Sequence, residues 1–360
     1  MGFFSNILNV FSRQRSEKDL EDLSVPLPLP FNTWVDESKV PGMAVTVLHR
    51  GKKVIQKGYG WADIDHRIPV DPKKTIFRIA SASKPIASMA LAKMVMEKKI
   101  DLDKSFYSYV PYFPRKEFDF SIRQLASHTA GIRGYRGKEY ALNKPYTIKE
   151  SLELFKNDPL QFRPGTDYLY NSFDWVLISL AMEEVSGIPF SEYLQEEILN
   201  PLGMTNTLVE VPEENPEGKA VPYTRTQSGF RPAIPVDNRY KLAGGGYLST
   251  SEDLSKLGQA YLENSLVSSE VMREFLTPQM VKGSSTYYGL GLQVSIDKTG
   301  RPFIGHVGNG VGGYSNFFVY PEDEVVISLL INCTDPKVQP LLDETVLPYV
   351  MDHLSSGSLI

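Results

Sequence analysis

The order of hydrophobic and polar positions divides the chain into a strand-rich beginning, a helix-rich middle and a strand-rich end. Residues 43–49 and 53–60 are β-prone runs, and the gap between them is glycine-containing and of hairpin length. After residue 288, β-prone runs alternate with turn sequences; they span residues 290–296, 302–306, 316–320 and 325–331. We predict an antiparallel sheet built from both ends of the chain, covered by a helix over residues 336–354.

Apolar residues at helical spacing dominate the middle of the chain. They predict helices that follow Ser81 and that span residues 122–131, 172–184, 189–199 and 252–261. Ser251 is the expected N-cap of the last of these. Residues 210–232, rich in Pro, Glu and Gly, predict a loop. The fold class is therefore α/β (α+β), an antiparallel sheet flanked by helices plus a mostly helical lobe.

The first residues are set apart from the rest. Apolar residues between Phe3 and Phe11 would share one helix face, and basic residues follow them. Two interpretations remain open: a helix packed on its own domain, or an amphipathic foot for peripheral membrane binding or self-association through residues 1–15. The segment does not match a signal peptide. We expect a leader over 1–24 and one catalytic domain over 25–355, with a sheet lobe from about 30–80 and 285–355 and a helical lobe from 81–284.

Composition narrows the classes of function. The formal net charge of −5 argues against a nucleic-acid partner. Cys333 is the single cysteine, which excludes an intramolecular disulfide and a cysteine-based metal site. No stretch approaches the roughly 18 apolar residues of a membrane span. We expect a small-molecule or short-peptide substrate and no cofactor or metal, and the compartment stays open with a slight preference for the cytoplasm.

Ser81 and Lys84 form the strongest candidate for chemistry. Ser81 lies at the turn between a short β-prone run and a helix, and Lys84 follows at i+3 on the same face. Pro85 suits the first helical turn. Backbone N–H groups at a helix start favour negative charge. This local arrangement is typical of a serine nucleophile with a lysine beside it.

A second Ser-x-x-Lys match, Ser295 to Lys298, lies on a strand that runs into a turn. Its two side chains do not share a helix face, so we reject it as a nucleophile. For the same reason we reject the neighbouring Lys298-Thr299-Gly300 triplet as the substrate-binding segment. His306-Val307-Gly308 is the better wall for a substrate, because it ends a predicted strand before a glycine-rich stretch.

Two further residues are candidates with competing interpretations. Tyr170 comes just before a predicted helix, so its phenol could face the same environment as Ser81. His128 lies at the end of a short predicted helix. With no acid close in sequence to orient it, a structural hydrogen-bonding role is favoured over a catalytic one.

The ordered motifs Ser81-Ala82-Ser83-Lys84, Tyr170-Asn171-Ser172 and His306-Val307-Gly308 resemble those of the serine β-lactamase and penicillin-binding protein superfamily. The likeness is greatest to its class C-like branch, which includes esterases, D-aminopeptidases and a mitochondrial lactamase-like serine peptidase. It covers about residues 30–350, and it implies a sheet and a helical lobe with the site between them.

The resemblance also implies roles. Ser81 would attack a carbonyl and form an acyl-enzyme, while Lys84 and Tyr170 move the proton. His306 would stand where many relatives have lysine. The backbone N–H groups of Ser81 and of Asn309, next to Gly308, would form the oxyanion hole. Whether Lys84 or Tyr170 is the general base stays open, because the unperturbed pKa of lysine is about 10.4 and burial must lower it.

Two departures from the superfamily pattern bear on the substrate. Ser172 stands where the pattern has asparagine, and His306 replaces a fixed positive charge with a group of pKa about 6.5. Binding of a substrate carboxylate should therefore be weaker, which favours a peptidase or esterase over a true β-lactamase. The alternative function is a catalytically weak scaffold that self-assembles or binds cell-wall peptides.

Overall fold

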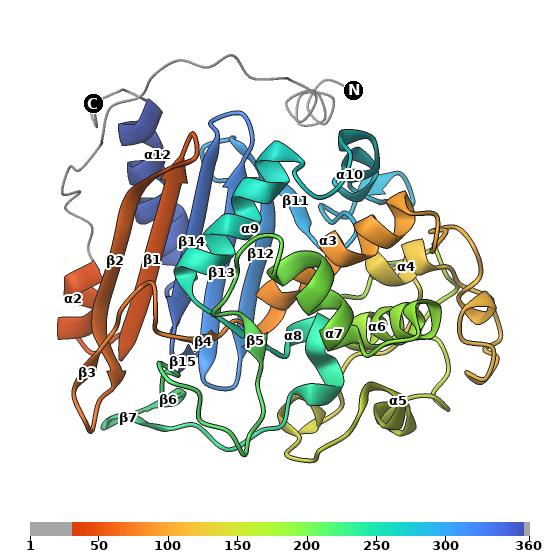
Figure 1. Ribbon diagram of the computed structural model, residues 1–360, viewed down its shortest axis with the longest axis horizontal. Coiled ribbons are helices and arrows are strands. Elements are labelled where there is room, and N and C mark those ends of the chain that lie inside the picture. Colours follow the sequence, from red (N-terminus) through yellow and green to blue (C-terminus); the bar gives the residue numbers. More distant parts are fainter. Residues whose placement is uncertain (1–30, 356–360) are drawn as a thin grey trace.

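The computed structural model describes residues 31–355, and its centre is an antiparallel sheet made from both ends of the chain, as predicted (Figure 1). Strand β1 (Gly42–His49) pairs with β2 (Lys52–Asp63) on one side and with β14 (Val325–Ile331) on the other. The order across the sheet is β11-β12-β13-β14-β1-β2-β3. The remaining strands are β3 (Ile68–Pro69), β11 (Gln293–Ile296), β12 (Pro302–Gly310) and β13 (Gly313–Tyr320).

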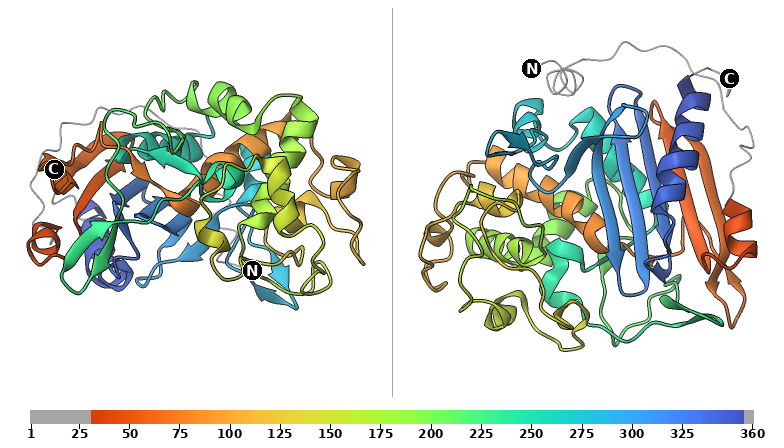
Figure 2. Two further views of the ribbon diagram at one scale, coloured as in Figure 1. Left: turned by 90° about the horizontal axis from the view of Figure 1, so that it is seen from below. Right: turned by 180° about the vertical axis from the view of Figure 1, so that it is seen from behind.

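Each face of the sheet is covered by helices, because side chains alternate between its two faces. In β1, Val45 and Val47 belong to the cluster formed with α2 (Phe31–Asp36) and α12 (Leu347–Ser355). Ala44 belongs to the other cluster, on the face crossed by α9 (Ser251–Glu263). Figure 2 shows α12 on the face opposite to α9. The predicted C-terminal helix is thus confirmed.

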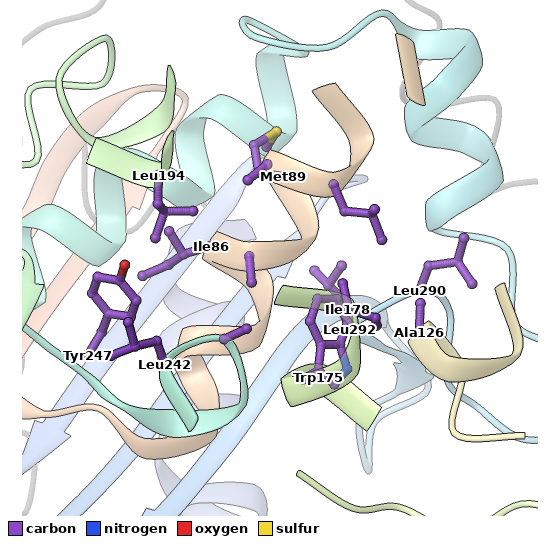
Figure 3. Packing of buried hydrophobic residues seen from close by; sticks show 14 of the residues in the cluster. Ile86, Met89, Ala126, Trp175, Ile178, Leu194, Leu242, Tyr247, Leu290 and Leu292 are labelled. Carbon is purple, nitrogen blue, oxygen red and sulfur yellow. The ribbon is translucent and has the colours of Figure 1, made fainter. Parts of the chain in front are cut away.

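The helical lobe is built around α3 (Ser83–Met96) and α6 (Phe173–Ser186), which are apolar on nearly all sides and therefore lie inside the molecule. In Figure 3, Ile86 and Met89 of α3 lie in one core with Trp175 and Ile178 of α6. This packing holds the helix that follows Ser81 rigidly in place. The other α-helices are α4 (Ile122–Ala126), α5 (Ile148–Ser151), α7 (Phe190–Leu194), α8 (Leu242–Gly245), α10 (Ser269–Phe275) and α11 (Gln339–Leu341).

Small sheets complete the structure. The sheet next to Ser81 orders β4 (Phe77–Arg78), β8 (Tyr247–Ser249) and β5 (Leu208–Val209). The others contain β15 (Cys333–Thr334), β6 (Tyr223–Thr226), β7 (Gly229–Pro232), β9 (Met280–Val281) and β10 (Ser284–Ser285). Within residues 31–355, no helix is both long and apolar enough to cross a bilayer.

Three local predictions are wrong. Residues 210–232 are not only loop, because they contain the β6–β7 hairpin. Thr250 rather than Ser251 caps α9, since its side chain accepts a hydrogen bond from the backbone N–H of Asp253. The strand carrying His306 does not end at the HVG triplet: β12 pairs with β13 as far as Gly310, so the glycines form a hairpin tip. The predicted leader, 1–24, lies outside the described residues.

Candidate active site

Ser81 sits in a short 3₁₀ turn, Ala80–Ala82, between strand β4 and helix α3, as the sequence predicted. The turn is strained, because Ala80 has a φ of 45°, in the left-handed region that residues with a Cβ avoid. Gly245 and Gly310 lie so near that a Cβ on either would approach Ala80 within 3.3 Å. Backbone from two other elements therefore packs around the turn and holds Ser81 in its position.

Ser81, Lys84 and Tyr170 meet as the sequence predicted. The Lys84 Nζ lies 3.2 Å from the Ser81 Oγ and 2.8 Å from the Tyr170 Oη, and the Tyr170 hydroxyl lies 2.8 Å from the Ser81 Oγ. Lys84 also donates to the carbonyl of Gly244 at 2.7 Å. The three side chains form a closed hydrogen-bonded triangle.

The environment separates the proton affinities of the two candidate bases. Lys84 is fully buried, and burial lowers its pKa to about 7; Asp174 opposes this shift and the positive charge of Lys241 adds to it. Burial of the hydroxyl raises the pKa of Tyr170 above its usual value of 10, although the residue as a whole is 39% exposed. Near neutral pH, Tyr170 therefore keeps its proton, whereas the Lys84 amine is far more readily neutral than an exposed lysine.

A neutral Lys84 amine satisfies every hydrogen bond in the triangle. It donates its two protons to Gly244 and to the Tyr170 Oη, and its lone pair accepts the Ser81 proton. The Tyr170 proton then points at the Ser81 Oγ. Lys84 is thus placed to take the proton of Ser81, and Tyr170 to stabilise the oxygen left behind.

His306 lies behind Tyr170 and not on the pocket wall. It is 3% exposed, and its ring centroid is 5.7 Å from that of Tyr170. Its Nδ1 donates to the carbonyl of Val307 at 2.7 Å, so its Nε2 accepts from the Tyr288 hydroxyl at 3.0 Å. Burial, with the nearby Lys84, lowers the pKa of His306 to about 3. It is therefore neutral at pH 7 and does not place a positive charge in the site.

Gly308 and Asn309 of β12 lie beside the Ser81 turn. A Cβ on Gly308 would come within 2.3 Å of the carbonyl oxygen of Ile79, so only glycine permits this approach. Pairing between β11 and β12 stops at Gly305, which leaves the following part of β12 without a β11 partner. Ser81 and Asn309 line the same pocket, together with Ser172 at the start of α6.

His128 has an acidic partner that sequence proximity does not reveal. Its Nδ1 lies 2.8 Å from the Asp174 Oδ2, and both side chains are buried. The His128 ring packs on Tyr170 with centroids 4.6 Å apart. The Asn171 side chain also donates to Asp174, at 2.7 Å. The buried hydrogen bond predicted for His128 is present, but the reason given for its role is wrong, because an acid does orient the ring: Asp174 is close only because α4 packs on α6.

The second Ser-x-x-Lys match plays no part in the site. Ser295 is in strand β11, and the Lys298 Nζ forms an ion pair with Glu344 at 2.7 Å on the surface. Neither residue lines the pocket beside Ser81.

Comparison with known proteins gives the family. The family model described as Beta-lactamase matches residues 30–348, which is most of the chain and all of the site. The chain belongs to the β-lactamase family. The chain is 30% identical to the human mitochondrial serine β-lactamase-like protein LACTB, and the match covers 80% of this chain and 70% of that protein. It is 28% identical to the putative penicillin-binding protein PbpX of Bacillus subtilis, over 81% and 67% of the two chains.

Solved structures give the same fold. The octameric penicillin-binding protein homologue from Pyrococcus abyssi superposes on this structure with a TM-score of 0.77 at 26% identity. The match covers 89% of this chain and 75% of that one. The D-amino acid amidase from Ochrobactrum anthropi also reaches 0.77, at 21% identity over 91% and 97% of the chains. The predicted superfamily and fold class are confirmed.

Proposed function

We propose that the protein is a serine hydrolase that forms an acyl-enzyme on Ser81 with Lys84 as general base. The observation that carries this proposal is the triangle of Ser81, Lys84 and Tyr170, together with the fall of the Lys84 pKa to about 7. A general base works best when its pKa lies near the working pH. A catalytically weak scaffold would have no need of this buried amine, so the site favours the hydrolase over that alternative.

In the proposed acylation, the Ser81 proton passes to Lys84 while the Oγ attacks the substrate carbonyl carbon. The negative charge that develops on the carbonyl oxygen is accepted by the backbone N–H groups of Ser81 and Asn309. Tyr170 gives its proton to the leaving amine or alcohol and regains one from Lys84. A water molecule, deprotonated by Lys84, then attacks the ester carbon; the bond to the Ser81 Oγ breaks, Lys84 returns the proton to that oxygen, and the acid is released.

The proposed reaction is cleavage of a peptide, amide or ester bond rather than of a β-lactam. Many relatives carry lysine at the position of His306, whereas here the side chain is neutral and buried. Ser172 at the pocket also has a shorter side chain than the asparagine of the superfamily pattern. Both changes support a substrate different from that of a β-lactamase.

A fluorophosphonate probe tests the nucleophile. The wild-type protein should be labelled at Ser81, Ser81→Ala should not be labelled, and Ser295→Ala should be labelled like the wild type because it changes the serine of the rejected motif. Equal labelling of Ser81→Ala and wild type would overturn the proposal. Rates for short peptides, D-amino-acid amides, acyl esters and a cephalosporin, each compared with Ser81→Ala, would then rank the substrates.

A further inference from the structure

The pocket beside Ser81 is positively charged. It encloses about 490 Å³, part of it open to solvent, and its lining includes two cationic side chains, Arg78 and Lys241, but no carboxylate. A pocket lined by one sign of charge attracts ligands of the opposite sign. The two cations differ in how far they are already neutralised.

Arg78 is held by partners inside the protein. Its guanidinium donates to both oxygens of the buried Glu210 and to the carbonyl of Val311. Lys219 also pairs with Glu210, at 3.0 Å, so this group of three side chains keeps one positive charge in total. Three of the five N–H donors of Arg78 are therefore already used inside the protein, and its charge is offset by Glu210.

Lys241 has no such partner. Its Nζ donates to the carbonyl of Tyr140 at 2.7 Å, and it lies 5.4 Å from the ring centroids of Tyr135 and Tyr240. Among residues 31–355, no carboxylate lies within ion-pair distance of it. An ammonium has three donors, so the Lys241 side chain retains capacity to bind an anion.

Lys241 is also placed rigidly relative to the nucleophile. It directly precedes α8 (Leu242–Gly245), and the carbonyl of Gly244 in that helix binds the Lys84 Nζ. A short run of backbone therefore connects the unpaired cation to the general base, and both Gly244 and Lys241 line the pocket with Ser81.

We propose that Lys241 binds a carboxylate of the substrate, so that the preferred substrates are amides or esters carrying a carboxylate close to the scissile bond. This inference rests on the proposed hydrolase function and names its substrate class. The sequence led us to expect weak carboxylate binding, because His306 in β12 replaces a positively charged residue. We now infer that Lys241, just before α8, supplies the positive charge instead.

Matched substrates test the proposal. One pair is the mono-4-nitroanilide of succinic acid and its carboxamide analogue, which have nearly the same size but differ in charge; a second pair carries the carboxylate or the carboxamide on the leaving amine. In at least one pair, wild-type kcat/KM at about pH 7 should favour the acid by about tenfold or more, the usual effect of a charged hydrogen bond. Lys241→Met should bring this ratio close to one, and Lys241→Arg should preserve the preference.

Lys241 could affect the rate by binding the carboxylate or by changing the pKa of Lys84. The second effect acts equally on the acid and the carboxamide, because both use the same base, so it cancels in the ratio of their kcat/KM values. Lys298→Met, which removes a lysine far from the pocket, should leave the ratio unchanged. Burial and the charge of Arg78 lower the Lys241 pKa to about 8, and Glu210 opposes this shift. The acid-to-carboxamide ratio of kcat/KM for the wild type should therefore fall as pH rises through about 8, because Lys241 loses its charge. The other charged groups nearby are Lys84 and Asp237, which pairs with Arg239; Arg239 also pairs with Glu213 at 3.3 Å.

The outcomes separate the two proposals. A ratio near one for wild type in both pairs, or a ratio that Lys241→Met does not change, would overturn the inference while leaving the hydrolase intact. If Ser81→Ala cleaves the substrates as well as the wild type does, or is labelled equally by the fluorophosphonate probe, the hydrolase proposal fails. Calorimetric binding of the same acid and carboxamide to Ser81→Ala then decides the inference without catalysis: tighter binding of the acid supports it and equal binding overturns it.

Discussion

At the scale of single residues, Lys84 controls the proposed chemistry through its protonation state. Only the neutral amine accepts the Ser81 proton, so kcat/KM for an uncharged ester should rise with pH and level off above the Lys84 pKa of about 7. His306 cannot produce this limb, because its pKa is lowered to about 3. A pH–rate profile with a neutral acyl ester measures the limb. A limb well below pH 6 would contradict the assignment of Lys84 as base.

The neighbouring charge of Lys241 should shift that limb. Its positive charge disfavours protonation of Lys84, so Lys241→Met should raise the Lys84 pKa and move the acid limb to higher pH by roughly half a unit. Lys241→Arg, which keeps the charge, serves as the control and should leave the limb near its wild-type position. A limb that Lys241→Met leaves in place would show that the two amines do not interact.

At this scale, contacts between residues of one helix or turn can be predicted from the sequence better than contacts between residues of separate elements. Ser81 and Lys84 are three residues apart, so helical geometry alone brings them together. Tyr170 is 86 residues from Lys84. Its position before a predicted helix made it a candidate, and the resemblance gave it a role. The pairing of His128 with Asp174 and the position of Lys241 in the pocket depend on how separate helices pack, which no local pattern records.

At the scale of elements, the approach of β12 to the Ser81 turn depends on Gly308. A Cβ there would meet the carbonyl of Ile79 and the hydroxyl of Ser315, each at 2.3 Å, and the strand would have to move away. Gly308→Ala should therefore lower kcat/KM for any ester by roughly tenfold to hundredfold, because displacement by a fraction of an ångström misaligns the oxyanion donors. Steady-state kinetics and circular dichroism together measure activity and fold.

Gly134→Ala is the matched control for that substitution. A Cβ at Gly134 would meet only the Asn171 Cβ, at the ordinary contact distance of 3.7 Å, so activity should stay near the wild-type value. If Gly308→Ala kept full activity, the backbone approach of β12 to the turn would have no part in catalysis.

At the scale of the whole molecule, the hydrophobic pattern predicts the architecture because the sheet and the central helices are specified by their own periodicity. The strands from both ends of the chain and the helices after Ser81 and Ser172 are confirmed. The pattern failed where pairing partners decide the structure: β12 extends to Gly310 because β13 pairs with it, and β6 and β7 are strands because they pair with each other. Burial of His306 follows from that same assembly of distant segments.

Burial of Lys84 should also affect the free energy of unfolding of the whole protein. The folded Lys84 pKa of about 7 lies below its unfolded value of 10.5, so the unfolded chain binds more protons between these two pH values and stability rises with pH there. Lys84→Met removes this dependence. Relative to Lys84→Met, the wild type should therefore gain about 1.4 kcal/mol of unfolding free energy per pH unit between about pH 7 and pH 10.

Urea unfolding of both proteins across this pH range measures the difference. Below about pH 7 the difference should be constant and least favourable to the wild type, because Lys84 is then protonated in both the folded and the unfolded chain. Lys298→Met is the control: Lys298 is an exposed lysine paired with Glu344, and its removal should not reproduce the rise. A difference that does not change with pH would mean that the Lys84 pKa is not depressed by folding, and the case for Lys84 as general base would fall with it.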